Sequence, residues 1–235
     1  MPDVAENLAE IRARILAACI RAGRAGDSVQ LIAVSKTFPV ESVRDAVAAG
    51  HLHFGESRIQ EAEGKIAALP GNLHWHFIGR LQRNKVRKAL ANFEVIHAVD
   101  SSALALHMDA AAKDMGLFPK AFLQVNISGE ESKGGFGPGQ LCAELELLLQ
   151  LERVEMIGLM CIPPAAANPE DARPWFVALR ELRDRLAAEF GANLPALSMG
   201  MSGDYEIAIE EGATHVRVGS AIFGKRAYRV DGELG

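Results

Sequence analysis

The chain has 235 residues, of which 49% are hydrophobic, 23% charged and 6% aromatic. This apolar content excludes an intrinsically disordered chain, and the lack of a dominating repeat excludes collagen and coiled coils. The chain carries 25 Lys and Arg against 30 Asp and Glu, a net charge of -5, so it has no overall electrostatic footprint for nucleic acid or an anionic membrane.

Hydrophobic spacing predicts a leading helix, from about residue 3 to 24, followed by alternating strands and helices. Strands are predicted, in chain order, at residues 29–36, 53–55, 73–79, 95–99, 121–127, 154–160, 196–199 and 215–218. Helices are predicted between them at residues 40–49, 58–69, 84–90, 103–115, 140–150, 175–190 and 205–211.

This alternation of strands and helices implies parallel strands joined by right-handed crossovers. Several of the strands are apolar along their whole length, as expected when both faces of a sheet are buried. About eight strands in a chain of this length fit a closed (β/α)8 TIM-type barrel with an extra N-terminal helix better than an open sheet. We therefore expect one α/β domain over residues 1–235, with its site at the C-terminal ends of the strands.

The cysteines and the N-terminal segment both favour the cytoplasm. Cys19, Cys142 and Cys161 lie far apart and form no CxxC pair, which is typical of a reducing compartment and disfavours a zinc ribbon. Residues 1–15 carry acids and arginines among the apolar residues, unlike a signal peptide. No apolar stretch is long enough to predict a membrane span.

Lys36 ends the first predicted strand and is the first candidate for chemistry. A side chain at this place in a barrel points into the mouth, where a neutral amine can attack a carbonyl and form an imine. Burial or cationic neighbours would favour the neutral amine. The plainer alternative is a surface lysine at the start of a loop, and Lys36 alone does not exclude it.

Two loops rich in glycine and serine follow the last two strands. The first runs through Met201, Ser202 and Gly203, and the second through Gly219 and Ser220. In barrels, the loops after strands seven and eight often bind phosphate through backbone N–H groups and a helix N-terminus. Alternatively, both loops are ordinary turns, with Ser202 able to cap the following helix.

The histidines and the basic segment give weaker signals. His51 and His53, and likewise His74 and His76, lie two residues apart, but no HExxH motif or suitably spaced carboxylate accompanies them. We therefore expect no metal site, and we expect these histidines to line the barrel mouth. The basic segment 80–88 is either a solvated helix face or a site that recruits an anionic ligand or nucleic acid.

A series of short motifs, spread over nearly the whole chain, carries a family resemblance. The motifs are AVSK at 33–36, FGE at 54–56, HFIGRLQRNK at 76–85, QVN at 124–126, GLM at 158–160 and, most specifically, SMGMSGD at 198–204 and VRVGSAIFG at 216–224. With them the chain resembles the pyridoxal phosphate homeostasis protein family. It departs where the family usually continues Phe-Gly-Glu with Asn-Tyr, since Ser57 and Arg58 stand there.

The resemblance implies a barrel like the N-terminal domain of alanine racemase, with pyridoxal 5'-phosphate (PLP) at its mouth. By the match, Lys36 would hold PLP as an internal aldimine and Arg217 would face the pyridine nitrogen. A permanent cation there would keep that nitrogen unprotonated and so weaken carbanion chemistry. The other cofactor-binding residues would be Met201, Ser202, Gly203, Gly219 and Ser220, of which the serines and glycines would hold the phosphate.

Three functions stay open at this point: a PLP carrier and buffer, an amino-acid racemase or decarboxylase, and a regulatory partner protein with PLP as ligand. Racemases of this type add a β-domain that supplies a tyrosine base, whereas residues 225–235 alone follow the final loop and Tyr205 and Tyr228 are the only tyrosines. We therefore expect a monomeric carrier that delivers PLP to apo enzymes, has little or no turnover, and has no nucleic-acid or membrane partner.

Overall fold

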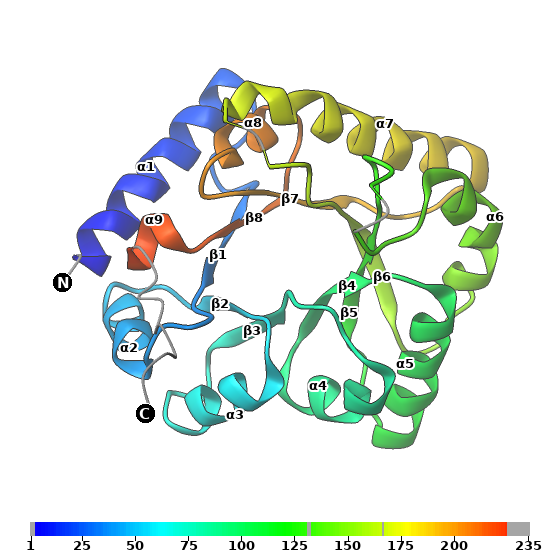
Figure 1. Ribbon diagram of the computed structural model, residues 1–235, viewed down its shortest axis with the longest axis horizontal. Coiled ribbons are helices and arrows are strands. Elements are labelled where there is room, and N and C mark those ends of the chain that lie inside the picture. Colours follow the sequence, from blue (N-terminus) through cyan, green and yellow to red (C-terminus); the bar gives the residue numbers. More distant parts are fainter. Residues whose placement is uncertain (1–2, 131–132, 166, 225–235) are drawn as a thin grey trace, which may run out of the picture.

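The alternating elements close into a parallel barrel in the computed structural model, which describes residues 3–130, 133–165 and 167–224 (Figure 1). The barrel closes because β1 pairs with β8 as well as with β2. The predicted TIM-type barrel is thus confirmed, while the ends of the predicted 1–235 domain lie outside the described residues. The strands are β1 (Gln30–Val34), β2 (His53–Glu56), β3 (His74–Phe77), β4 (Val95–Val99), β5 (Lys120–Gln124), β6 (Glu155–Met160), β7 (Ala196–Met201) and β8 (His215–Val218).

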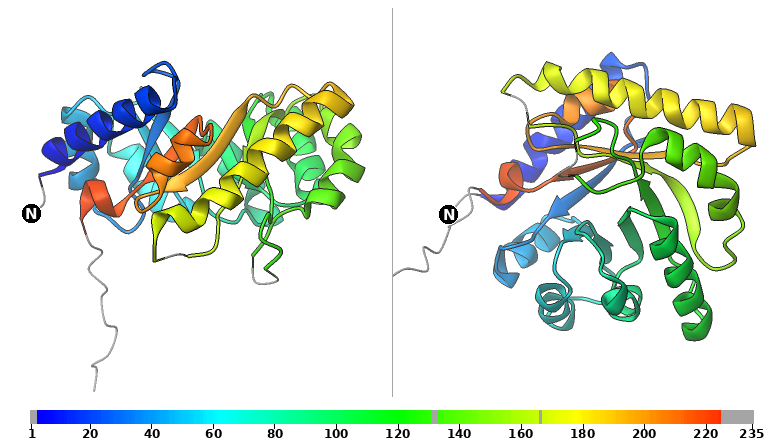
Figure 2. Two further views of the ribbon diagram at one scale, coloured as in Figure 1. Left: turned by 90° about the horizontal axis from the view of Figure 1, so that it is seen from above. Right: turned by 45° about the vertical axis from the view of Figure 1, so that its right-hand side comes forward.

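Helices surround the barrel as an outer layer (Figures 1 and 2). Each buries an apolar stripe against the strands, which is why the helical spacing could be recognised in the sequence. No helix in the described parts of the chain has the length and apolar character needed to cross a membrane. The helices are α1 (Val4–Arg21), α2 (Val40–Ala48), α3 (Ile59–Ala67), α4 (Val86–Asn92), α5 (Ser102–Met115), α6 (Pro138–Leu149), α7 (Arg173–Phe190), α8 (Tyr205–Glu210) and α9 (Ser220–Phe223), with 3-10 turns η1 (Arg83–Lys85) and η2 (Pro169–Ala172).

The extra N-terminal helix α1 joins the beginning of the barrel to its end. The Asp3 side chain caps α1 by accepting hydrogen bonds from two backbone N–H groups of its first turn. The helix lies beside α8 and α9 (Figure 2), and the Asn7 side chain donates to the Ile222 carbonyl at 2.8 Å. The first and last parts of the described chain are therefore packed against each other.

The end of β1 differs from its prediction. The strand stops at Val34, and residues 35–38 form a turn in which the Phe38 N–H donates to the Ser35 carbonyl at 3.1 Å. Thr37 in this turn has a φ of 70°, which is unusual for a β-branched residue. Lys36 thus lies in a turn after the strand, and does not continue the strand itself.

Candidate functional site

The candidate residues lie at the C-terminal ends of three neighbouring strands. Lys36 follows β1, Arg217 lies in β8, and Met201 is the last residue of β7. Because β8 pairs with both β1 and β7, with Arg217 aligned to Ile32 on one side and Met201 on the other, these residues share one sector of the barrel mouth. The remaining candidates follow β7 or β8 directly: Ser202, Gly203, Gly219 and Ser220.

The loops after β7 and β8 contact each other. The Gly219 N–H donates to Ser202 Oγ at 3.2 Å. A Cβ at Gly219 would lie only 3.1 Å from the Val34 carbonyl oxygen, so the missing side chain lets this loop approach the end of β1. The loop after β8 thus contacts both the Ser202 loop and the end of β1 that precedes the Lys36 turn.

The structure does not bear out the alternative in which Ser202 caps the helix after β7. The N-cap of α8 is Asp204, whose Oδ1 accepts a hydrogen bond from the Met201 N–H at 2.6 Å. Ser202 Oγ meets Gly219 instead. Beside it, a Cβ at Gly203 would meet no atom within 4 Å, so the tip of the loop is open.

Arg217 is buried, and its guanidinium is held by three hydrogen bonds. Nη1 donates to the Ser198 carbonyl at 2.9 Å and to Ser198 Oγ at 2.5 Å, and Nη2 donates to the Cys161 carbonyl at 3.0 Å. A guanidinium has five N–H groups, so these bonds leave two for a ligand. Burial lowers the pKa of Arg217, whereas the nearby Cys161 and Asp204 act in the opposite direction. The residue offers a ligand only donors.

A buried ion-pair cluster anchors the turn that carries Lys36. Lys65 Nζ, on α3, donates to the Ser35 carbonyl at 2.8 Å, to Glu56 Oε1 at 2.6 Å and to Glu61 Oε1 at 2.8 Å. The same Glu61 oxygen accepts a hydrogen bond from the Thr37 N–H at 2.5 Å. The residues on both sides of Lys36 are therefore tied to α3, and this tie holds Thr37 at its positive φ.

Glu56 lies at the centre of this cluster and is fully buried. Ser35 Oγ donates to its Oε1 at 2.7 Å. Burial raises the pKa of Glu56, and the hydrogen bonds from Lys65 and Ser35 oppose that rise. The role of Lys65 was not predicted from the sequence, although one signal was available. Lys65 falls on the apolar stripe of α3 with Ile59 and Ala62, where a buried lysine requires a partner.

Two cavities flank the Ser202 loop. The first, of about 490 Å³, is lined by Met201 and Gly203 and, from other loops, by Lys133 and Ile162. Its volume is within the range of small-molecule sites.

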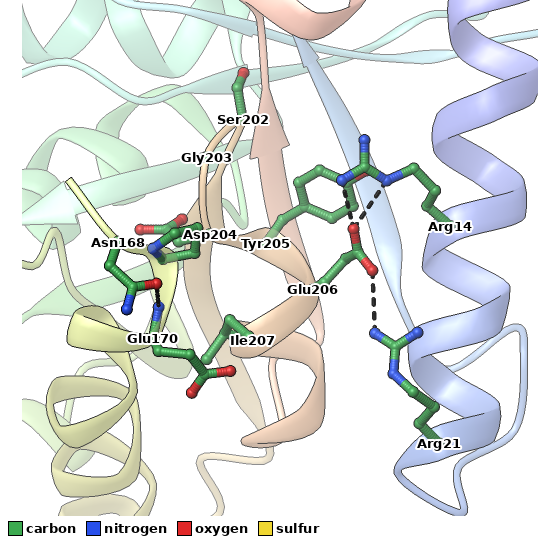
Figure 3. A pocket seen from close by; sticks show the side chains of 11 residues that line it. Arg14, Arg21, Asn168, Glu170, Ser202, Gly203, Asp204, Tyr205, Glu206 and Ile207 are labelled. Atoms are coloured by element: carbon green, nitrogen blue, oxygen red, sulfur yellow. Dashed lines mark hydrogen bonds and ion pairs between the residues drawn. The ribbon is translucent and has the colours of Figure 1, made fainter. Parts of the chain in front are cut away.

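The second cavity, of about 300 Å³, lies against α1 and α8 (Figure 3). There Glu206 lies between two arginines of α1 and pairs with Arg14 at 2.6 Å and with Arg21 at 3.0 Å. The Arg14 guanidinium also lies 5.5 Å from the centre of the Tyr205 ring. These contacts join α1 to α8 below the Ser202 loop.

The histidines do not line the mouth, and this prediction was wrong. His53 and His74 are the first residues of β2 and β3, so they lie at the opposite, N-terminal end of the barrel. His76 is buried in the barrel interior. Among residues 3–130, 133–165 and 167–224, no cluster of three or more histidine, cysteine or carboxylate side chains could hold a metal ion.

Comparison with known proteins identifies the family of the chain. The model of the alanine racemase N-terminal domain matches residues 7–227. A pyridoxal phosphate homeostasis protein of Aquifex aeolicus (strain VF5) is 45% identical over 227 residues, covering 96% of this chain and 100% of the relative. The chain belongs to the pyridoxal phosphate homeostasis protein family. Another member of the family, from Pseudomonas aeruginosa, is 45% identical over 232 residues, covering 97% of this chain and 98% of its own.

Solved structures agree with this family assignment. PipY of Synechococcus elongatus PCC7942, a COG0325 family member, has a TM-score of 0.86 without PLP at 43% identity, covering 94% of this chain and 100% of its own. Its structure with PLP bound has a TM-score of 0.83 at 42% identity, with the same coverage. An alanine racemase of Clostridium difficile 630 shares the fold at 17% identity, with a TM-score of 0.73 over 98% of this chain and 57% of the racemase.

Proposed function

We propose that this chain binds pyridoxal 5'-phosphate at the ends of β1, β7 and β8 and acts as a carrier and buffer of the cofactor. The observation that carries the proposal is the meeting of the Lys36 turn, Arg217 and the two phosphate-type loops in one sector of the mouth. The family of the protein supports the choice of ligand, as does the PLP-bound structure of PipY, which is 42% identical to this chain.

The chemistry of the donor set fits the cofactor. PLP carries an aldehyde, a pyridine nitrogen and a phosphate, and the mouth offers the amine of Lys36, the guanidinium of Arg217 and the two C-terminal loops. Arg217 has two N–H groups that its contacts with Ser198 and Cys161 do not use. The open space at Gly203 beside the Ser202 hydroxyl leaves room for a phosphate oxygen.

Each proposed residue has a separate task in holding the cofactor. Lys36 Nζ anchors the aldehyde end, and the cluster around Lys65 fixes the turn from which that side chain extends. Ser202, Gly203, Gly219 and Ser220 would hold the phosphate, beside Met201 at the end of β7, with the Gly219 N–H orienting the Ser202 hydroxyl to which it donates.

The guanidinium of Arg217 supports carriage over turnover. Bound PLP supplies an electron-withdrawing ring, which stabilises carbanions best when its nitrogen is protonated. With the cofactor bound, Arg217 would place a positive charge at that nitrogen and would oppose its protonation. The residues present thus favour retention and delivery of PLP, with apo PLP-dependent enzymes as recipients.

The proposal also includes the setting of the protein. We place a monomeric, single-domain carrier in the cytoplasm, and the free cysteines Cys19, Cys142 and Cys161 support a reducing compartment.

Trapping with borohydride tests the anchor. Protein loaded with PLP is reduced, digested and mapped by mass spectrometry, in the wild type, in Lys36→Ala and in Lys113→Ala, a control at a lysine that is exposed on α5 and paired with Glu152. The wild type and Lys113→Ala should carry a pyridoxyl group on the Lys36 peptide, and Lys36→Ala should carry none there. An equal amount of trapped cofactor in Lys36→Ala would refute the assignment of Lys36.

A further inference from the structure

A line of hydrogen-bonded polar side chains crosses the barrel interior. It runs from Arg217 on β8 through Ser198 on β7, His97 on β4 and His76 on β3 to His53 on β2. Ser198 Oγ lies 2.8 Å from His97 Nδ1, His97 Nε2 lies 3.0 Å from His76 Nδ1, and His76 Nε2 lies 3.2 Å from His53 Nδ1. Ser198 and His97 are fully buried and His76 is 3% exposed. Four hydrogen bonds in series therefore start at the guanidinium that we assign to the pyridine nitrogen.

The direction of these hydrogen bonds follows from the chemistry of Arg217. A guanidinium only donates, so Ser198 Oγ accepts from it. The other contact of Ser198 Oγ is His97 Nδ1. If His97 donated there, the buried Ser198 hydroxyl proton would have no acceptor among these contacts, which costs free energy. The Ser198 hydroxyl therefore donates to His97 Nδ1.

The same argument passes along the imidazoles. A neutral imidazole carries one proton, so an acceptor at Nδ1 of His97 places the proton on Nε2. His97 Nε2–H then donates to His76 Nδ1, and His76 Nε2–H donates to His53 Nδ1. Each histidine has one defined tautomer, although the last of them is four hydrogen bonds away from Arg217.

The surroundings of the hydrogen-bonded histidines favour neutral imidazoles. Burial lowers the pKa of His97 well below its usual range, and His76 and Arg217 lower it further. Burial likewise lowers the pKa of His76, helped by His215 and His53. Phe122 stacks on the His97 ring with centroids 4.6 Å apart, so one side of this ring is covered by an apolar side chain.

The hydrogen-bonded series approaches the protein surface at His53, the end opposite Arg217. The His53 ring stacks on His74, with centroids 4.5 Å apart, and His74 Nδ1 lies 2.7 Å from Glu94 Oε2 at the exposed N-terminal end of the strands. The interior histidine His215 is not part of the series, because its Nδ1 meets Thr214 Oγ1 at 2.8 Å. His215 therefore offers a matched control.

We propose that Ser198, His97 and His76 are positioning residues for Arg217, and that they hold its guanidinium in one orientation through a directed chain of neutral imidazoles. Ser198 Oγ can accept from Arg217 without leaving its own proton unpaired only while His97 presents an acceptor. The role of these residues toward the cofactor rests on the proposed function. The existence of the hydrogen-bonded series from Arg217 to His53 does not.

The first test reads the tautomers directly in the protein without cofactor. Long-range ¹H–¹⁵N NMR distinguishes the two ring nitrogens of each histidine, and the exposed His107 serves as the reference. At pH 7.5 we expect His97, His76 and His53 all to carry the proton on Nε2, with Nδ1 unprotonated. A proton on Nδ1 of His97, or an equal mixture of tautomers there, would overturn the proposal.

The second test asks whether the hydrogen-bonded series keeps the Arg217 guanidinium in one orientation. Asparagine at position 97 can still present an acceptor to Ser198, whereas leucine cannot. We expect the Arg217 Nε–H to exchange with solvent at least ten times faster in His97→Leu than in the wild type, and at nearly the wild-type rate in His97→Asn and in the control His215→Asn. In Ser198→Ala, a smaller change, the Arg217 Nε–H should also exchange faster than in the wild type. This variant replaces His97→Leu if His97→Leu does not fold.

Equal exchange rates in Ser198→Ala and the wild type would refute the positioning role. The link to the cofactor has its own readout, the pH dependence of the absorption of bound PLP. That dependence should change in His97→Leu and stay unchanged in His215→Asn. A wild-type protein that binds no PLP but shows the expected tautomers would refute the proposed function without contradicting the hydrogen-bonded series. The two failures are therefore distinguishable.

Discussion

Replacing Lys65 with methionine tests the buried ion-pair cluster under the Lys36 turn. Methionine keeps most of the apolar length of lysine on α3 but removes Nζ, and with it the hydrogen bonds to the Ser35 carbonyl, Glu56 and Glu61. Glu56 is fully buried and would then lose the ammonium group that lies 2.6 Å from its Oε1. The variant thus leaves an acceptor and a carboxylate without their main donor.

The contacts of Lys65 set the expected size of the effect. Removing one partner of a buried ion pair costs about 3–5 kcal/mol, because the other charge stays buried. The Glu61 side chain is 24% exposed and can be hydrated, so its pair adds little. Glu56 can also take up a proton, since burial already raises its pKa, and this relieves part of the cost. We expect Lys65→Met to lower the free energy of unfolding by about 4 kcal/mol.

Urea unfolding, followed by circular dichroism and by tryptophan fluorescence, measures this loss. The comparison includes Glu56→Gln and the double variant Glu56→Gln/Lys65→Met, in which both charges are absent. Because neither charge is then left unpaired, the double variant should be at least about 2 kcal/mol more stable than the sum of the single losses predicts. Additive losses, or a loss below about 1 kcal/mol in Lys65→Met, would refute a coupled buried pair.

Three further predictions concern packing and pH. Gly158→Ala should lower the free energy of unfolding by more than about 3 kcal/mol in a urea titration, because its Cβ would lie 1.9 Å from the Ala196 carbonyl oxygen between β6 and β7. Gly64→Ala in α3, where a Cβ meets nothing within 4 Å, should instead raise it by about 0.5–1 kcal/mol, and a loss there would contradict the helix propensity argument. Burial lowers the pKa of His51 and His215 from 6.5 to about 4, so the unfolded chain binds their protons first as the pH falls. Their contribution should be complete above pH 6.5 and fall by up to about 3 kcal/mol each toward pH 4, so His51→Asn should show a flatter stability profile than the wild type.

The barrel could be predicted from the sequence because its elements depend on local patterns. β8 has the predicted bounds, since its two valines, Val216 and Val218, are followed directly by a glycine. β1 was predicted to end two residues too late, because Ser35 and Lys36 continue the same pattern. The turn that ends β1 depends on Glu61 and Lys65 of α3, and no local pattern shows those contacts.

The site could be predicted only in part, for the same reason. Barrel closure places β8 between β7 and β1, so the topology alone puts the last two loops near the end of β1. The partner of Ser202 is Gly219, and this contact between loops could not be read from the local capping pattern. A spacing of two residues places His74 and His76 on one strand face, but it does not say which end of the barrel they occupy. The directed chain from Arg217 joins five strands, so no single stretch of sequence contains it.

The pairing of β1 with β8 also has a consequence for synthesis on the ribosome. The Asn7–Ile222 contact and the β1–β8 ladder join residues that are far apart in the sequence, so the ribosome adds the second partner long after the first. Until β8 emerges, one edge of β1 has no partner and the side of α1 that faces α8 and α9 stays uncovered. An unpaired strand edge beside apolar surface promotes aggregation. Nascent chains from which β8 has not yet emerged from the ribosome are therefore the form of this protein that most needs a chaperone.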